Sequence, residues 1–499
     1  MESLKIKKDI CIVGSGFCGY AAYKELSAHK LDLILVEGGK VKTPLNKNEQ
    51  NNYKLSNNEY IQSVRKKRIK NNIEPSFRER KFTLGGSSEC WTGWIKPLEK
   101  STLENCFANL PNQIWKDIEI NKYKDKVLEL LNSPIKDFSY LKNIQNLGIN
   151  LPKLSQNFEY TTYAWAEKPL RIKNYWKKKL IKDIKNPNIN DDQNVICGFS
   201  LCDYKSKSDQ IISLEFEDRK KNKLVIESKF FMFCMGGIEN AKFVKKILSQ
   251  NRSIQKKSKQ IIGNFQEHPH LYHIATFNKG RVKIPEILIN PIKINPNKST
   301  FTKKGSLKIS FKISEGKGTP SASIEIVENQ QNIFEQSKNI LRTIKGRTYL
   351  PNSDYKIVMR CEQTPNKRSK LTFSSPKNFL NWDILETDFI YYSNYLKRFG
   401  SYLLLNGYAN DFRLTEPSKD NIAFPKEVIG GSHHMGTVPF LKSEELITKK
   451  FFLKDYKNLY VVGTSAFPLS GFENPTHAAM AISLIASEDI INKSKKIKP

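Results

Sequence analysis

The fold is decided by the N-terminal stretch Ile10-Cys-Ile-Val-Gly14-Ser-Gly16-Phe-Cys-Gly19. Its first four residues form a short apolar run, which predicts a buried parallel strand. The glycines follow at once, and Tyr20–Ser27 has the pattern of a helix. Leu31–Val36 is apolar enough for a second strand, which Glu37 ends. Strand, glycine turn, helix and strand in this order form the context in which a G-x-G-x-x-G sequence binds a dinucleotide.

Each glycine of this turn has an expected task. Gly14 permits the tight turn, Gly16 lets the backbone approach a pyrophosphate, and Gly19 lets the helix pack closely on the strand. The free N–H groups at the start of the helix would meet the pyrophosphate, and Glu37 would accept hydrogen bonds from a ribose hydroxyl. An acid at this place disfavours NADP, whereas NAD and FAD both remain open. A glycine-rich turn without a ligand is the alternative.

The middle of the chain continues the α/β pattern. A small sheet beside the dinucleotide-binding unit is predicted from three strand-like stretches, Val195–Ser200, Ile211–Phe216 and Lys223–Glu227. Lys229–Cys234 then predicts a buried strand, and Ile238–Leu248 predicts a helix. The pair Gly236-Gly237 separates them, so a second turn is expected where the backbone can approach a cofactor.

From about residue 284 the pattern becomes that of an antiparallel sheet. Apolar and polar residues alternate in Leu307–Ile313 and in Ala322–Ile326, and period-two alternation predicts a sheet with one wet face. Further strands are predicted over 354–363 and 371–374, and Phe389–Leu405 returns to helical character. We therefore predict an antiparallel-sheet domain inserted into a dinucleotide-binding domain.

The C-terminal part contains a glycine-flanked histidine pair, Gly430-Gly-Ser-His433-His434-Met-Gly436-Thr437. The pair lies in a stretch without helical or strand periodicity, where the backbone can approach a ligand, so a functional site is favoured over two structural histidines. After a buried strand ending at Gly463, two loops follow, Thr464–Pro468 and Gly471–His477. Taken singly, Thr464 and Asn474 have a plain alternative as helix-entry and turn-forming residues.

Composition limits the classes of protein that fit. The chain has 499 residues, with 82 Lys+Arg against 50 Asp+Glu and a formal net charge of +32, which is long enough for two or three domains. The charge invites a nucleic-acid interpretation. The basic residues are spread along the whole chain, however, and Lys, Asn and Ile together suggest a bias towards AT-rich codons. We therefore expect no nucleic-acid partner.

The compartment is expected to be the cytoplasm. The eight cysteines form no C-x-x-C pair and no zinc spacing, which suits a reducing environment. The N-terminal apolar run is too short for a signal sequence, and no stretch is long and apolar enough for a transmembrane helix.

Taken together, the residues resemble the glucose–methanol–choline (GMC) family of FAD-dependent oxidoreductases. The resemblance rests on segments in the family's order: the first glycine turn with Glu37, Gly85–Gly93, Gly236–Asn240, Gly263–Pro269, Thr364–Ser374, and His433–Thr437 with Asn474-Pro475. The Gly-Gly-Ile-Glu-Asn and Asn-Pro-Thr forms look closest to the pyranose-oxidase-like, sugar-oxidising branch. The resemblance implies a Rossmann-like FAD-binding domain over 1–270 and 425–499, with an α+β substrate domain over 271–424.

The same resemblance implies the site residues. The family's catalytic histidine stands in His-x-x-Gly-Thr, which is His433 here, and its partner maps to Asn474 rather than to His477. Val195 would offer backbone contacts on the adenine side, and Gly463, Thr464 and Phe467 would lie near the flavin. The implied cofactor-binding residues are Gly14, Gly16, Phe17, Gly19, Glu37, Gly85, Gly86, Ser87, Cys90, Val195, Gly236, Gly463, Thr464, Phe467, Pro475 and Thr476.

These residues fit the oxidation of an alcohol or sugar CH–OH group. His433 would take the hydroxyl proton, since imidazole titrates near neutral pH. Asn474 would hold the hydroxyl oxygen as charge develops, and the flavin N5 would receive the hydride. Some family members attach FAD through a histidine at the position that is Cys90 here, so non-covalent FAD is expected.

Other functions stay open at this stage. The family includes lyases and a photodecarboxylase, so the fold does not fix the chemistry, and a basic protein that binds nucleic acid or an anionic surface is the other alternative. The electron acceptor can be oxygen, a quinone or a carrier protein, and the substrate within the alcohols and sugars is undetermined. The diffuse positive charge predicts at most long-range steering of anionic substrates or of an acidic carrier.

Overall fold

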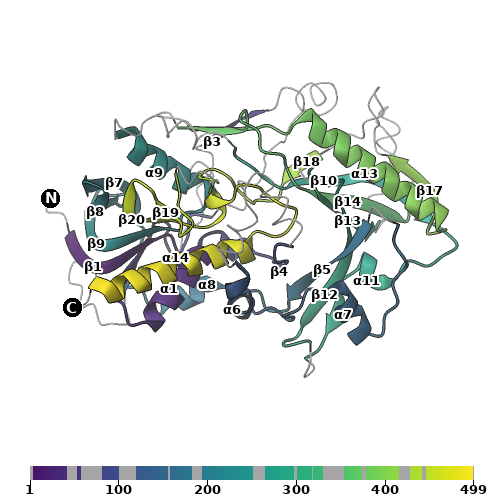
Figure 1. Cartoon of the computed structure of the whole chain (residues 1–499), viewed down its shortest axis with the longest axis horizontal. Helices are drawn as coiled ribbons and strands as arrows, with labels where there is room; N and C mark the ends of the chain where they lie inside the picture. The colour runs from purple at the N-terminus through teal and green to yellow at the C-terminus, as the bar shows by residue number, and fades with distance from the viewer. Residues whose placement is uncertain are drawn as a thin grey trace.

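The computed structural model describes residues 4–41, 53–57, 81–99, 120–155, 158–181, 194–250, 264–296, 300–316, 319–329, 353–373, 378–414, 427–440 and 446–497. The polar stretch from about residue 40 to residue 80 is predicted from the sequence to lie at the surface, and it includes a basic cluster at residues 66–70. Both lie almost wholly outside the described residues. Two large sheets dominate, and they lie side by side along the long axis of the molecule (Figure 1). No helix in the part of the chain that the structure describes is long and apolar enough to cross a membrane.

The first sheet has the strand order β19-β20-β9-β1-β2-β6, and β20, β9, β1, β2 and β6 pair in parallel. Its strands are β1 (Leu4–Val13), β2 (Leu33–Glu37), β6 (Val195–Cys197), β7 (Ser200–Lys207), β8 (Gln210–Glu217), β9 (Lys223–Phe233), β19 (Phe452–Leu453) and β20 (Tyr456–Val461). The two strands expected at β1 and β2 are confirmed, and β1 extends further towards the N-terminus than the apolar run indicates.

The small sheet expected beside this unit is instead part of it. Strand β6 pairs with β2, and β8 pairs with β9. The two stretches predicted as separate strands, 223–227 and 229–234, form the single strand β9, because it pairs with β1 from Leu224 to Phe233. One continuous backbone ladder leaves no place for a break at Ser228.

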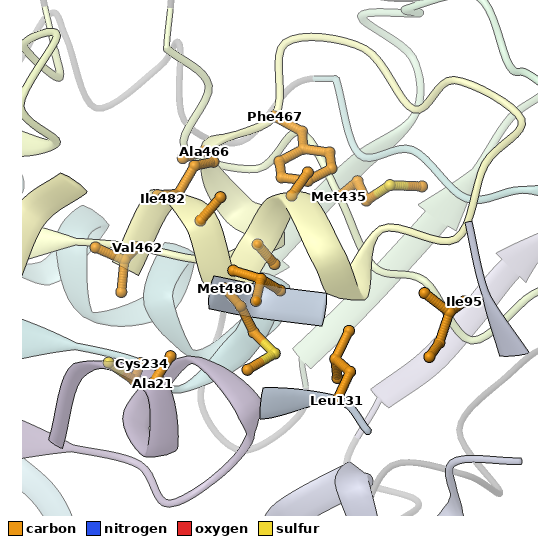
Figure 2. Close-up of a cluster of buried hydrophobic side chains, with 14 of the residues drawn as sticks. Ala21, Ile95, Leu131, Cys234, Met435, Val462, Ala466, Phe467, Met480 and Ile482 are labelled. Atoms are coloured by element: carbon orange, nitrogen blue, oxygen red, sulfur yellow. The ribbon is translucent and has the colours of Figure 1, made fainter. Parts of the chain in front are cut away.

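Three long helices accompany the first sheet: α1 (Phe17–Ala28), α9 (Gly236–Gln250) and α14 (Thr476–Ile497). Helix α14 runs across α1 (Figure 1). Figure 2 shows a buried cluster around α14, to which Met480 and Ile482 of α14, Ala21 of α1 and Val462 after β20 belong. Burial of these apolar side chains stabilises the contact by about 25 cal/mol per Å². The packing holds the C-terminal loops over the glycine turn.

The second sheet has the order β17-β10-β14-β13-β12-β5-β4, with β11 beside β12 and β18 beside β10, and its pairs are antiparallel. Its strands are β4 (Trp94–Ile95), β5 (Phe158–Ala166), β10 (Pro269–Lys279), β11 (Ile292–Ile294), β12 (Gly305–Ile313), β13 (Ala322–Glu328), β14 (Tyr355–Cys361), β17 (Ala409–Leu414) and β18 (Glu427–Gly430). The predicted antiparallel sheet is thus present.

One face of this sheet is apolar and packs on α13 (Glu386–Leu405), which lies along the sheet (Figure 1). Phe311 of β12 and Phe158 of β5 contact Phe399 of the helix, with ring centroids 4.8 and 5.7 Å apart. The opposite face carries the polar residues of the alternating strands. We call it the polar face and define it by Thr161, Tyr163, Lys308, Ser310, Lys312, Ser323, Glu325 and Arg360.

The expectation that this second face is wet is wrong. Lys308 is 5% exposed, Ser310 0% and Glu325 5%. The face is covered by the segment that follows β4, which contains Glu99, and by the loop before α14, which contains Phe472. Lys312 hydrogen-bonds Glu99 at 2.8 Å and lies 6.0 Å from the ring of Phe472. Alternation in sequence cannot distinguish a face turned to solvent from a polar face closed inside the molecule.

Sheet membership does not follow the predicted division at residues 270 and 425. Strands β4 and β5 come from the N-terminal segment and β18 from the C-terminal one, yet all three pair in the second sheet. Strand β5 pairs with β12 over nine residues. This long-range pairing makes β5 a strand of the second sheet, although it precedes residue 270.

The remaining elements are short. A third sheet contains β3 (Tyr53–Asn57), β15 (Lys370–Phe373) and β16 (Asn378–Trp382). The short helices are η2 (Gly86–Cys90), η3 (Ile120–Tyr123), α6 (Lys124–Leu130), α7 (Tyr140–Asn146), α8 (Ile172–Lys177), α11 (Glu286–Ile289) and η5 (Thr464–Ala466).

Candidate active site

A cavity of about 1090 Å³ lies where the first glycine turn, the segment 81–94, the polar face and the C-terminal loops meet. The first sheet contributes the carboxyl ends of its parallel strands, which is where ligands bind in open α/β sheets. Both predicted catalytic residues line this cavity, together with most of the predicted cofactor-binding residues.

The glycine turn has the geometry that close packing demands. Gly14 has φ +103°, and a Cβ atom there would lie 2.6 Å from the carbonyl oxygen of Cys234. A Cβ on Gly19 would lie 2.0 Å from the carbonyl oxygen of Gly14. Gly16, by contrast, borders the cavity, and the nearest atom to a Cβ there is 4.0 Å away. Gly14 and Gly19 therefore hold the turn together, whereas Gly16 leaves its backbone open to the cavity.

Glu37 is tied to the turn by hydrogen bonds. Its Oε2 accepts from the backbone N–H of Ser15 at 2.9 Å and from the Ser15 hydroxyl at 2.6 Å, and its Oε1 accepts from Gly39 N–H at 2.7 Å. Burial raises the pKa of Glu37, and these hydrogen bonds act against that rise. The Glu37 side chain also lines the cavity.

The residues present fit a dinucleotide such as FAD. Helix α1 begins at the cavity with Gly16 as its N-cap, and no side chain caps its first N–H groups. Free N–H groups and the positive end of a helix bind a pyrophosphate. Together with Glu37 at the cavity wall, these groups would hold the pyrophosphate and a ribose of such a cofactor.

Fourteen of the predicted residues line the cavity. They are the catalytic His433 and Asn474, and Gly14, Gly16, Phe17, Glu37, Gly86, Ser87, Cys90, Gly236, Gly463, Thr464, Pro475 and Thr476. The structure thereby brings together residues that are as far apart in sequence as the first turn and the last helix.

Four of the predicted residues do not line it. Gly19 packs the helix on the turn, and the N–H of Gly85 donates to the Ser15 hydroxyl at 2.7 Å, fixing the neighbouring loop. Val195 bonds Lys179 and Ile181 through both of its backbone groups, at 3.1 and 3.0 Å. Phe467 belongs to the buried hydrophobic cluster of Figure 2. At the edge of the first sheet, Gly198, Phe199 and Ser200 line the cavity instead.

The histidine loop is anchored to the second glycine turn. Thr437 donates to the carbonyl oxygen of Gly237, and Thr464 donates to that of His434 at 2.7 Å. A Cβ on Gly237 would lie 2.2 Å from the His434 carbonyl oxygen, so glycine is needed for this approach. The predicted turn at Gly236-Gly237 thus supports the loop that carries His433.

His433 also contacts His268, which lies just before β10. Its Nδ1 lies 2.9 Å from Nδ1 of His268, and the Nε2 of His268 lies 3.0 Å from the carbonyl oxygen of Ser470. The backbone N–H of His433 donates to Glu267 Oε2 at 2.9 Å. Glu267 and His268 lie in the segment Gly263–Pro269, which the sequence identified as a motif without assigning either residue a role.

This chain of hydrogen bonds assigns the proton positions. Burial lowers the pKa of His268 to about 4, so this ring is neutral at physiological pH. Because a carbonyl oxygen only accepts, Nε2 of His268 carries the proton and its Nδ1 is the acceptor. His433 must then donate through Nδ1, which leaves Nε2 of His433 unprotonated. Burial and the neighbouring histidines hold the pKa of His433 well below its usual value, which keeps the ring neutral.

Asn474 and His477 have different surroundings. Asn474 lines the same cavity as His433, at the entry to α14. His477 is buried, its Nε2 lies 3.3 Å from the carbonyl oxygen of Lys124, and it lines a separate cavity of about 990 Å³. Asn474 thus shares a cavity with His433, whereas His477 lines a different one.

Comparisons with known proteins agree with this architecture. Residues 405–483 match the family model described as GMC oxidoreductase. The chain is similar in structure to pyridoxine 4-oxidase from Mesorbium loti, with a TM-score of 0.55 and 16% identity over 97% of this chain and 99% of that chain. It is also similar to formate oxidase, with a TM-score of 0.57 and 13% identity over 99% of this chain and 100% of that chain. A search of curated proteins gave no match.

The predicted fold class is confirmed. The chain shares its α/β fold with these two solved structures over almost its whole length. At these levels of identity the likeness establishes the fold alone.

Proposed function

From the premise that the chain carries the C-terminal segment of the GMC oxidoreductases on the fold of that family, we propose that it oxidises the CH–OH group of an alcohol or sugar. FAD bound non-covalently at the first glycine turn is the proposed cofactor. His433 is the proposed base, and Asn474 is its proposed partner.

The observation that carries this proposal is the hydrogen-bond chain from Ser470 through His268 to His433. It supports a neutral His433 whose Nε2 holds a free lone pair at a cavity shared with Asn474 and the glycine turn. A base must be unprotonated before it can take a proton. A chain of neutral rings ending at a carbonyl oxygen favours that state.

In the proposed reaction His433 Nε2 accepts the hydroxyl proton of the substrate. The Asn474 side-chain amide donates a hydrogen bond to the same oxygen, which orients the substrate and stabilises the negative charge that develops on it. His268 keeps the imidazole in the required tautomer and orientation. FAD supplies the hydride acceptor when it is bound.

Cys90 is the residue that bears on how FAD is attached. Cys90 lines the cavity on η2 at the position where some family members carry a linking histidine. We propose that this position makes no bond to FAD. Acid precipitation of the purified protein should release the yellow colour into the supernatant, and colour that stays with the pellet would overturn this part.

The test of the function is anaerobic reduction of the bound flavin, in the dark, across a panel of sugars, polyols and simple alcohols. We expect the visible flavin band to bleach with at least one class and to stay unchanged without substrate. A protein that remains colourless after incubation with FAD would contradict the proposal, and so would a flavin that no member of the panel reduces.

A further inference from the structure

The polar face of the second sheet carries a buried cluster with an excess of positive charge. Lys308 Nζ lies 3.2 Å from Glu325 Oε2, and the Arg360 guanidinium pairs with the other oxygen of the same carboxylate. The side chains of Lys308 and Glu325 are 6% and 7% exposed, whereas that of Arg360 is 25% exposed. Two cations therefore share one carboxylate, and the more accessible cation is Arg360.

A neighbouring cluster on the same face shows the balanced alternative. Lys312 pairs with Glu99 and Glu159 at 2.8 and 3.0 Å, and Lys96 pairs with Glu99 at 2.6 Å. Two lysines there meet two glutamates. Burial, followed by the charge of Arg360, lowers the pKa of Lys308 to about 8, which is the direction expected for a cation in an electropositive site.

Arg360 reaches the cavity together with two polar groups that lack partners. Arg360, Tyr163 and His270 all line it. The Tyr163 hydroxyl and the His270 Nε2 are buried and have no hydrogen-bond partner among the residues that the structure describes. A buried polar group without a partner costs about 1–3 kcal/mol, so such groups mark the place of a ligand or of ordered water.

These groups lie close to the proposed base. His270 of β10 is directly opposite Arg360 of β14 in the strand register. A Cβ on Gly431 would lie 2.9 Å from His270 Nε2 and 3.1 Å from His433 Nδ1. One glycine therefore separates the His433 ring from the His270 ring, and the next strand over carries the guanidinium. His433, His270 and Arg360 all line the same cavity.

We propose that the substrate is an alcohol that carries an anionic group, a carboxylate or a phosphate, which binds Arg360 while the hydroxyl meets His433. Tyr163 and His270 donate further hydrogen bonds to the same group. A guanidinium has five donor hydrogens and binds both oxyanions through two parallel hydrogen bonds, so its contact with Glu325 leaves donors for the ligand. Lys308 stabilises the buried Glu325 carboxylate. The identity of the substrate rests on the proposed oxidation, whereas anion binding does not.

The direct test is binding rather than turnover. The protein is saturated with FAD, so that the pyrophosphate site is filled, and titrated calorimetrically with oxalate, with inorganic phosphate and with neutral oxamide. We expect oxalate or phosphate to bind, and oxamide to bind far more weakly. The preferred anion separates a carboxylate from a phosphate substrate.

Variants assign the binding to the cluster. Arg360→Gln should weaken the preferred anion about 100-fold, and Arg360→Lys should restore part of that loss. Arg360→Gln alone removes a partner of the buried Glu325 carboxylate. The double variant Arg360→Gln/Glu325→Gln removes that carboxylate as well, and it should also lose binding. The matched control is Arg398→Gln, since Arg398 pairs with Glu315 at 2.9 Å on the α13 side of the sheet; it should bind as the wild type does. Equal anion binding in the wild type and both Arg360→Gln forms would overturn the proposal, as would no anion binding.

A kinetic arm separates this proposal from the proposed function. Matched pairs such as glycolate with glycolamide, and glycerol phosphate with glycerol, are tested for anaerobic flavin reduction. We expect the charged member to reduce the flavin at far lower concentration, and Arg360→Gln to raise its KM about 100-fold while leaving that of the neutral member unchanged. Equal KM values within each pair would overturn the anionic class while alcohol oxidation stands. Arg360-dependent anion binding without flavin reduction by any alcohol would overturn the oxidation and keep the anion site.

Discussion

The two ends of the cavity are built in opposite ways. At the first glycine turn, the groups proposed to hold the cofactor come from one contiguous stretch, and most of them are backbone groups: Gly14, Gly16 and Glu37 lie within the first forty residues. At the other end, Tyr163, His270, Arg360 and His433 arrive from three strands and one loop, and their side chains provide the chemistry. Added atoms should therefore impair stability and FAD binding at the turn. Removal of functional groups should impair the reaction at the other end of the cavity.

The largest effect is expected from one added methyl group at the turn. Gly19→Ala places a Cβ atom 2.0 Å from the carbonyl oxygen of Gly14, and neither backbone can yield without separating α1 from the sheet. We expect the free energy of unfolding in urea to fall by about 3 kcal/mol or more, with loss of FAD binding.

The matched control is Gly16→Ala. Its backbone has φ −69°, and a Cβ there meets nothing within less than 4.0 Å. This variant should unfold at the wild-type urea concentration and yet bind FAD more weakly, because the methyl group projects towards the cofactor. Equal stability of both alanine variants would show that the turn is not limited by packing.

Removal of a functional group is tested by His433→Gln. The amide keeps polarity and approximate size but cannot accept a proton, so we expect flavin reduction by the best alcohol to slow about 100- to 10,000-fold with stability and FAD content unchanged. His434→Gln is the comparison. His434 Nε2 lies 3.4 Å from Glu267 Oε1, and we expect this variant to slow the reaction by no more than about tenfold. The reverse ranking in stopped-flow measurements would assign the base to His434.

A smaller effect is expected at the positioning residue His268. His268→Leu removes the acceptor for His433 Nδ1–H, and we expect reduction to slow about 10- to 100-fold. His268→Asn places an amide oxygen near the position of the lost ring nitrogen and should recover part of the rate. A merely structural role predicts that both variants lose stability together and that asparagine gives no kinetic recovery.

The two ends of the cavity also differ in how well the sequence predicts them. The glycine turn, its flanking strands and Glu37 are predicted because their pattern is local, and His433 and Asn474 are predicted through a family resemblance. Arg360, Tyr163 and His270 are not, because what brings them together is the register of β5, β10 and β14 within the second sheet. The burial of the polar face is missed for a related reason: alternation gives the two faces of a strand but does not tell what covers them. Val195 and Phe467 were placed at the cavity by resemblance, and their contacts lie elsewhere.

The smallest effect concerns a histidine outside both ends. Burial lowers the pKa of His477 to about 4, below the value of about 6.5 in an unfolded chain. The unfolded state therefore binds more protons between these values, and stability falls as pH falls from about 6.5 towards 4, by about 1.4 kcal/mol per pH unit for this group. In His477→Gln that contribution is absent.

Urea unfolding at pH 7 and pH 5 measures this difference. We expect the wild type to lose more stability than His477→Gln between the two pH values, and flavin reduction at pH 7 to be the same in both proteins. Equal pH dependence of stability would mean that His477 is not held neutral by burial.

The central claim is that this cavity breaks the C–H bond next to a hydroxyl group while FAD is bound at the glycine turn. The most direct measurement is single-turnover bleaching of the bound flavin, anaerobic and in the dark, with the best alcohol carrying hydrogen or deuterium at the reacting carbon. The account predicts that the flavin bleaches in the dark and that deuterium slows the bleaching. Product formation that needs light, or that leaves the flavin oxidised throughout, would contradict it.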